Sequence, residues 1–363
     1  NIPALDIFMV YHNDNFNSDT AAAILGSMGL NILHISYYFN RITVQGDTSL
    51  IDTIENFSWT NIVQVLRETE NHNDGARASI NVVNIQAAPW GVPNPYNLTG
   101  NGVNIGMMEA ESPPPHDDYN IRLNVIEVLI PPAPLAIPHA AHVCGTLAGN
   151  GSRSILNGGT DFQWAGVATE ADIFTWNMTT VPIPRPDKML AGVQNQQIVI
   201  ANNSWGWGPT TDCWAYGYYD AECRDYDILV RDENLTVFFS AGNWRQVFIS
   251  FCGLAPGYGS VQPLGTAKNV VTVGAITTAG SMPNFSDWGP TQDGRLKPDI
   301  VAVGVDVISC DENNAYFMNT GTSMACPAAS GTATLLIEQI TNLYNFAPPP
   351  ALIKAILLNS ADD

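Results

Sequence analysis

The stretch that decides the fold is Asn319-Thr320-Gly321-Thr322-Ser323-Met324-Ala325-Cys326-Pro327-Ala328-Ala329-Ser330-Gly331. Small residues and a Thr lead into Ser323, and a run of Ala, Ser and Gly follows it. This pattern predicts a tight turn that feeds a helix with Ser323 at or near its first turn, where Pro327 is also tolerated. A helix start offers free N–H groups and a partial positive charge, which suits a nucleophile beside a developing anion. The alternative is a small-residue helix that only packs on a sheet.

Other apolar runs of the chain predict an α/β fold. The 363 residues are 45% hydrophobic and suffice for one large domain and a small one. Short β-branched runs separated by helical stretches are typical of a mostly parallel sheet covered on both faces. These runs span 103–108, 172–176, 197–201, 235–240, 269–274 and 299–303. In such sheets the chemistry lies at the carboxyl ends of the strands.

The first 80 residues predict a separate α+β unit. Strands are expected at 4–10, 30–38, 41–45 and 62–68, with helices at 18–28 and 49–55, the first capped by Ser18. The resulting β-α-β-β-α-β order is a split βαβ, or ferredoxin-like, sandwich. The polar segment 68–78 is predicted to be a linker and processing region. A generic ligand-binding or accessory domain is the alternative.

The net charge is −20 with only 14 Lys and Arg, so the surface disfavours nucleic acid and anionic membranes. No apolar run reaches the roughly 18 to 20 residues of a membrane span, because prolines interrupt the longest run at 126–143. The sequence begins at Asn1 without a charged-then-apolar leader, so a signal peptide has either been removed or was never there.

Two motifs carry a family resemblance. Gly-Thr-Ser-Met-Ala-x-Pro at 321–327 resembles the serine motif of subtilisin-like proteases (subtilases), and 138–149 resembles their His-Gly-Thr-His-Val-x-Gly-Thr motif. The resemblance implies a nucleophile at Ser323 and a general base at His139. Ala140 and Ala141 stand where Gly-Thr is usual. His142, one turn further on, is expected to be a hydrogen-bonded core histidine.

A third motif, at 102–111, resembles the family strand that ends in the triad Asp. Glu109 takes that position, 30 residues before His139, and the order acid, His, Ser is that of subtilisin. A Glu can accept the same hydrogen bond, but its extra methylene displaces the carboxylate, and misplacement by about 1 Å can cost about a hundredfold in rate. Glu111 is the weaker candidate because it lies past the strand end. An exposed strand-end acid is the alternative for Glu109.

Further segments resemble family binding elements. The Ala241-Gly242-Asn243 segment implies that the Asn243 amide and the Ser323 N–H form the oxyanion hole. Ser204-Trp205-Gly206 is similar to the edge that pairs with an extended substrate, where Trp205 either lines a pocket or is a core aromatic. His116-Asp117-Asp118-Tyr119 resembles a family segment whose Asp binds calcium in some members. A structural calcium ion with Asp118 as one ligand is therefore an open alternative.

The resemblance covers residues 80–363 and implies a subtilisin-like three-layer catalytic domain at 79–363, whose C-terminal end looks truncated. Residues 1–78 would be the pro-domain and linker, acting as folding template and intramolecular inhibitor. We expect a secreted serine endopeptidase, carried in zymogen form, that acts on polypeptides and needs no cofactor for its chemistry. The substitutions at 109 and 140–141 also favour a catalytically impaired pseudoprotease with a binding or regulatory role.

The six Cys residues predict disulfides in an oxidising compartment. Cys213 and Cys223 flank an aromatic loop and are the best pair, and Cys252 and Cys310 are a second pair. Cys144 and Cys326 either pair or remain buried thiols. Asn-x-Ser/Thr sequons add weak support for secretion. They lie at Asn56, Asn97, Asn150, Asn177 and Asn234.

Overall fold

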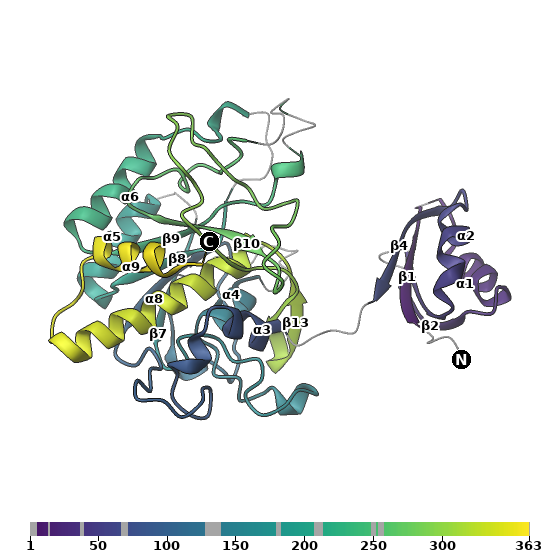
Figure 1. Cartoon of the computed structure of the whole chain (residues 1–363), viewed down its shortest axis with the longest axis horizontal. Coiled ribbons are helices and arrows are strands. Elements are labelled where there is room, and N and C mark those ends of the chain that lie inside the picture. Colours follow the sequence, from purple (N-terminus) through teal and green to yellow (C-terminus); the bar gives the residue numbers. More distant parts are fainter. Residues whose placement is uncertain are drawn as a thin grey trace. The chain divides into compact units, whose positions relative to one another are not determined.

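The computed structural model describes residues 6–13, 15–36, 40–66, 72–127, 139–178, 183–206, 213–247, 252 and 258–362. The chain forms two compact units, Asn1–Glu70 and Asn71–Asp363 (Figure 1). Of the predicted linker, residues 68–71 lie outside the described residues. The rest is not a linker, because helix α3 (His72–Ser79) begins there and belongs to the larger unit.

The small unit has the predicted β-α-β-β-α-β order. Its elements are β1 (Asp6–His12), α1 (Ser18–Ser27), β2 (Asn31–Ser36), β3 (Arg41–Gly46), the 3-10 turn η1 (Thr48–Leu50), α2 (Ile51–Glu55) and β4 (Thr60–Leu66). The strands form one antiparallel sheet in the order β2-β3-β1-β4. Every other residue of β1 and β3 faces the helices, which gives a core that includes Phe8, Val10, Leu25 and Ile42.

The cap of α1 differs from the prediction by one residue. Asn17, rather than Ser18, is the N-cap, and its side-chain oxygen accepts the N–H of Thr20 at 3.0 Å. Ser18 is instead buried, and its hydroxyl is bonded to His12 at 2.9 Å. Both residue types cap helices well, so composition alone could not separate them.

The large unit is built on a seven-stranded parallel sheet in the order β11-β10-β9-β8-β5-β7-β6. The strands are β5 (Asn104–Glu109), β6 (Leu123–Val125), β7 (Asp172–Asn177), β8 (Ile200–Asn203), β9 (Thr236–Ser240), β10 (Val271–Ile276) and β11 (Ile300–Val303). All six predicted strands are present. The largest shift is at β8, because Gln197 ends the preceding helix in a left-handed conformation, with φ of 55°.

Helices cover both faces of this sheet (Figure 1). One face packs against α3, α4 (His139–Ala148), α8 (Thr322–Tyr344) and α9 (Pro350–Ser360), and the other against α5 (Arg185–Gln196) and α6 (Ala221–Asp232). Neighbouring residues of β5 point to opposite faces of the sheet. Met107 packs in the first core, on the side of α4 and α8, and Met108 packs in the second core, on the side of α5 and α6. The predicted three-layer α/β fold is confirmed.

Shorter elements complete the unit. They are the hairpin of β12 (Val307–Cys310) and β13 (Tyr316–Asn319), and the 3-10 turns η2 (Val82–Asn84), η3 (Asn120–Arg122), η4 (Ile155–Asn157), η5 (Cys213–Ala215) and η6 (Glu312–Asn314). Within the described ranges, no helix combines the length and the apolar character needed to cross a membrane.

The start of α8 matches the prediction, with one correction. Gly321 is the N-cap and Ser323 is the second helical residue. Pro327 is the sixth, so it lies in the second turn and not in the first. Because proline has no N–H, it cannot donate to the carbonyl of Ser323 four residues earlier.

Both predicted disulfide pairings are wrong. The disulfide joins Cys213 to Cys252, and Cys223 and Cys310 are free thiols. Cys223 cannot reach Cys213, because it points from the first turn of α6 into the second core, where its sulfur lies 3.3 Å from Thr266 Oγ1. Cys144 and Cys326 are buried free thiols, one of the two expected outcomes.

Candidate active site

The imidazole of His139 and the carboxylate of Glu109 form a hydrogen-bonded pair. Glu109 is the last residue of β5 and His139 is the first of α4, so the sheet edge and the helix start present them to each other. His139 Nδ1 donates to Glu109 Oε2 at 2.8 Å. Glu109 is only 1% exposed, whereas the His139 side chain is 31% exposed. The arrangement fixes Nδ1 as a donor and leaves Nε2 able to accept a proton.

Ser323 lies at the start of α8, but its hydroxyl has a different partner. Ser323 Oγ donates to the main-chain oxygen of Ser204 at 2.8 Å, and the residue is 9% exposed. Among the described contacts, none joins this hydroxyl to His139. The hydroxyl proton of Ser323 therefore points to Ser204 and must be redirected before it can pass to the imidazole.

The segment after β9 presents Asn243 to the same helix start. Asn243 Oδ1 accepts the N–H of Thr322 at 2.8 Å and its hydroxyl at 2.9 Å. The same hydroxyl accepts the N–H of Gly242 at 3.2 Å. With Oδ1 held in this way, Nδ2 lies beside Gly321, where a Cβ would be only 3.3 Å from it. The same Cβ would lie 3.7 Å from the main-chain nitrogen of Ser323, so the amide and this N–H flank one point at the helix start.

A second carboxylate joins the site. Glu111 Oε1 accepts the N–H of Ala140 at 3.0 Å, in the first turn of α4. Burial raises the pKa of Glu111, an effect that its bond to Ala140 opposes and that Glu109 reinforces. Burial alone would lower the pKa of His139, but attraction to Glu109, their hydrogen bond and the charge of Glu111 together raise it.

His142 takes no part in this cluster, as predicted. It is buried, and its Nε2 lies 2.8 Å from the main-chain oxygen of Val307. Burial lowers the pKa of His142 to about 3, so the ring is neutral at physiological pH. Its ring also packs edge-on against Phe317, at 4.9 Å between centroids.

The Ser204-Trp205-Gly206 segment continues from the end of β8. Trp205 is only 8% exposed, packs edge-on against Phe239 and lies under the guanidinium of Arg185 at 4.8 Å. Its side chain is therefore a core aromatic, which is the second of the two alternatives expected from the sequence. Gly206 is exposed, and an added Cβ there would collide with Gln262.

Two residues that support the site carried no recognisable sequence signal. Gln262 Nε2 donates to the main-chain oxygens of Ser240 at 2.6 Å and Trp205 at 3.2 Å, which ties the ends of β8 and β9 together. Asp287 brackets the loop of Asn243, because its N–H donates to Gly242 O and its Oδ2 accepts the N–H of Trp244. Burial raises the pKa of Asp287 to about 8. Both act through distant main-chain groups, which no local pattern reveals.

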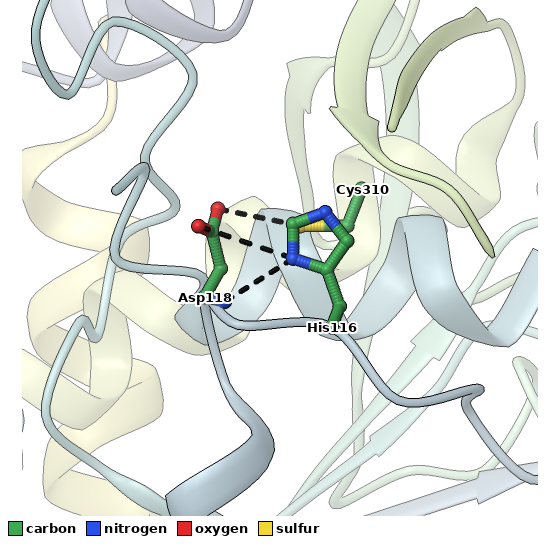
Figure 2. A group of neighbouring side chains, drawn as sticks. All are labelled: His116, Asp118 and Cys310. Carbon is green, nitrogen blue, oxygen red and sulfur yellow. Dashed lines mark hydrogen bonds and ion pairs between the residues drawn. The ribbon is translucent and has the colours of Figure 1, made fainter. Parts of the chain in front are cut away.

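The only group of metal-ligand side chains within the described ranges is His116, Asp118 and Cys310, all fully buried (Figure 2). Asp118 Oδ1 accepts from Ser152 and Arg153. Oδ2 accepts from Gly151, Tyr316 and Cys310. His116 Nδ1 accepts the N–H of Asp118, and its Nε2 faces Ala315 O at 3.1 Å.

Protein donors thus occupy both oxygens of Asp118. The geometry favours a hydrogen-bonded anchor that joins the loop after Asn150 to the β12–β13 hairpin, and not an ion site. Whether the protein holds a structural calcium ion stays a prediction.

Comparison with known proteins identifies relatives of the chain. A family model described as Subtilase family matches residues 135–363, more than half of the chain. Serine protease AprX of Bacillus subtilis is 26% identical over 310 residues, covering 75% of this chain and 64% of AprX. The C5a peptidase of Streptococcus pyogenes is 40% identical over 104 residues, covering 26% of this chain and 9% of that protein.

A third relative, the serine protease/ABC transporter B family protein tagD of Dictyostelium discoideum, is 23% identical over 472 residues. That alignment covers 97% of this chain and 24% of tagD. The chain thus spans less than two thirds of each of these relatives.

Solved structures agree on the fold. A cold adapted subtilisin-like serine proteinase matches with a TM-score of 0.54 at 20% identity, covering 81% of this chain and 93% of that one. Patellamide maturation protease PatA matches with a TM-score of 0.53 at 19% identity, covering 72% and 89%.

Proposed function

Because the chain belongs to the subtilase family of serine proteases, we propose that it is a secreted endopeptidase with a triad of Ser323, His139 and Glu109. The observation that carries this proposal is the 2.8 Å bond between His139 Nδ1 and the buried carboxylate of Glu109. The Cys213–Cys252 disulfide supports secretion, since disulfides persist mainly in oxidising compartments.

In the proposed mechanism, Ser323 Oγ turns from Ser204 toward His139 Nε2 and attacks the carbonyl carbon of a peptide bond. His139 takes the hydroxyl proton and returns it to the leaving amine, which leaves an acyl ester on Ser323 that water then hydrolyses. Glu109 holds the ring and stabilises the imidazolium. The peptide lies along 204–206 as an added strand, with Ala241 and Gly242 on its other side. These steps call on no cofactor.

Asn243 is proposed to complete the oxyanion hole with the N–H of Ser323. We expect Asn243→Ala to lower kcat by about 10²- to 10³-fold with little change in KM, the order found for the equivalent donor of subtilisin. Steady-state kinetics on one peptide measures both constants. Asn284→Ala, a change of the same type at another loop of the same unit, is the control. Equal losses in both variants would contradict the assignment.

We also propose that the small unit is a pro-domain that restrains the larger one. The split βαβ unit and the start of a separate body at residue 71 support this role. A specific protease site inserted between Glu70 and Asn71 tests it, with a scrambled insert as the control. Hydrolysis should increase after cleavage and removal of residues 1–70. Unchanged hydrolysis would show that the unit does not inhibit.

The second candidate function is a pseudoprotease that binds partners without cleaving them. The specific observation in its favour is that Ser323 donates to Ser204 and not to His139. Incubation with a fluorophosphonate probe and with a peptide library separates the candidates. Labelling at Ser323 together with cleaved peptides supports the endopeptidase, whereas a folded protein that neither reacts nor cleaves after removal of residues 1–70 supports the pseudoprotease.

A further inference from the structure

Two carboxylates at the end of β5 hold consecutive residues of α4. Glu109 accepts from the ring of His139, and Glu111 accepts from the main-chain N–H of Ala140. Glu109 is the last residue of β5 and Glu111 lies in the bend that follows it, so both acids reach the start of α4 from the same end of the strand. The side chain of the base and the backbone that carries it are therefore held from one short segment of the chain.

The hydrogen bond from the N–H of Ala140 to Glu111 satisfies a main-chain donor at the start of α4. An N–H in the first turn of a helix has no acceptor within the helix, and a carboxylate there also interacts favourably with the positive end of the helix dipole. Fixing the backbone next to His139 limits how far the ring can tilt relative to Glu109. A shift of this kind by about 1 Å is enough to reduce a rate strongly.

Glu111 also acts on the charge of the base. Its attraction and that of Glu109 raise the pKa of His139 against the opposing effect of burial. An ion pair of Lys188 and Glu127 lies beyond Asn177, which accepts from Lys188 and donates to the main-chain oxygen of Ala110. Three other titratable groups near His139 and Glu109 are neutral at pH 7. Burial keeps His142 deprotonated, and it keeps the thiols of Cys144 and Cys326, which lie near Glu109, protonated by raising their pKa. The two glutamates thus supply the negative charge that the imidazole meets.

We propose that Glu111 is a positioning residue for His139, which anchors the first turn of α4 and adds a second negative charge beside the imidazole. The catalytic consequence of this role rests on the proposed function, whereas the effect on the imidazole does not. Glu111→Gln keeps an oxygen that can accept the N–H of Ala140 but removes the charge. Glu111→Ala removes both.

The decisive measurement is an NMR titration of the His139 ring in the full chain, with its resonance assigned by loss in His139→Gln. The midpoint should fall in Glu111→Gln, because removing a negative charge disfavours the imidazolium. Asp225→Asn is the control, since Asp225 is an exposed acid on α6 and its loss should leave the midpoint in place. An unchanged midpoint in Glu111→Gln overturns the proposal, whether or not the protein cleaves peptides.

The pH dependence of kcat/KM gives the second readout. In Glu111→Gln the acidic limb should move to lower pH while the plateau stays within about threefold of the native value, because the anchor is kept. Glu111→Ala should in addition lower the plateau. A plateau that falls equally in both variants, with no movement of the limb, would mean that Glu111 serves only the fold. If the protein shows no hydrolysis even after residues 1–70 have been removed, the proposed function fails, and the NMR titration still decides the role of Glu111.

Discussion

Replacing Ser323 by Ala should lower kcat for peptide hydrolysis by about 10⁶-fold, the order found for the nucleophile of subtilisin. The hydroxyl is the group that forms the acyl ester, and no neighbouring side chain of the described site offers a substitute. Covalent labelling by a fluorophosphonate should disappear together with hydrolysis. Kinetics on one peptide and intact-mass measurement after labelling record the two effects.

The fold should survive this change. Ser323 loses one hydrogen bond to Ser204, which corresponds to about 1 kcal/mol of unfolding free energy. Ser330→Ala is a matched control on the same helix, because Ser330 is also buried and its hydroxyl donates to Asn202 Oδ1 at 3.0 Å. It should lose similar stability and keep its activity. Hydrolysis by Ser323→Ala within tenfold of the native rate would rule out Ser323 as the nucleophile.

Replacing Glu109 by Gln should lower kcat by about 10⁴-fold, the order found when the triad acid of a serine protease becomes its amide. The amide cannot stabilise the imidazolium, and it favours the wrong tautomer when its N–H₂ faces Nδ1. Glu338→Gln is the control. Glu338 is another buried glutamate, whose oxygen accepts the N–H groups of Thr99 and Gly100, so its change should affect stability without affecting kcat.

Glu109→Asp tests whether the length of the glutamate side chain matches the position of His139. Aspartate is the residue at this position in the family pattern, but its side chain is shorter by one bond of about 1.5 Å. Because the contact from His139 to Glu109 is already 2.8 Å, the shorter acid should leave a gap and lower kcat by about a hundredfold. A gain in activity with aspartate would show that glutamate impairs the site, which favours the pseudoprotease.

The sheet and the contact between Glu109 and His139 could be predicted from the sequence, because both depend on local patterns. Apolar runs such as 103–108 and 235–240 are continuous because the strands are buried on both faces, and Glu109 ends such a run. Direct contact with His139 then followed from the family order of acid and base. The role of Glu111 was not predicted, since its partner is a main-chain N–H about thirty residues away.

The predictions that were wrong depended on contacts and element boundaries that only the folded chain defines. The aromatic loop after Cys213 suggested a short disulfide, but the direction of α6 turns Cys223 into the core. Polar composition at 68–78 suggested a linker, although residues 72–79 form α3, with Ala76 buried in the core. The first-turn position expected for Pro327 was wrong because the helix begins only at Thr322.

The Cys213–Cys252 bond closes a covalent ring across 39 positions of the chain, and that ring contains α6, β9 and Asn243. A cross-link over a loop of this length stabilises a fold by about 4 kcal/mol, through the freedom it removes from the open chain. The amide assigned to the oxyanion hole is therefore tethered on both sides by a bond that reductants break. Reduction of this bond should therefore loosen the segment from α6 to Asn243 at the carboxyl end of the sheet.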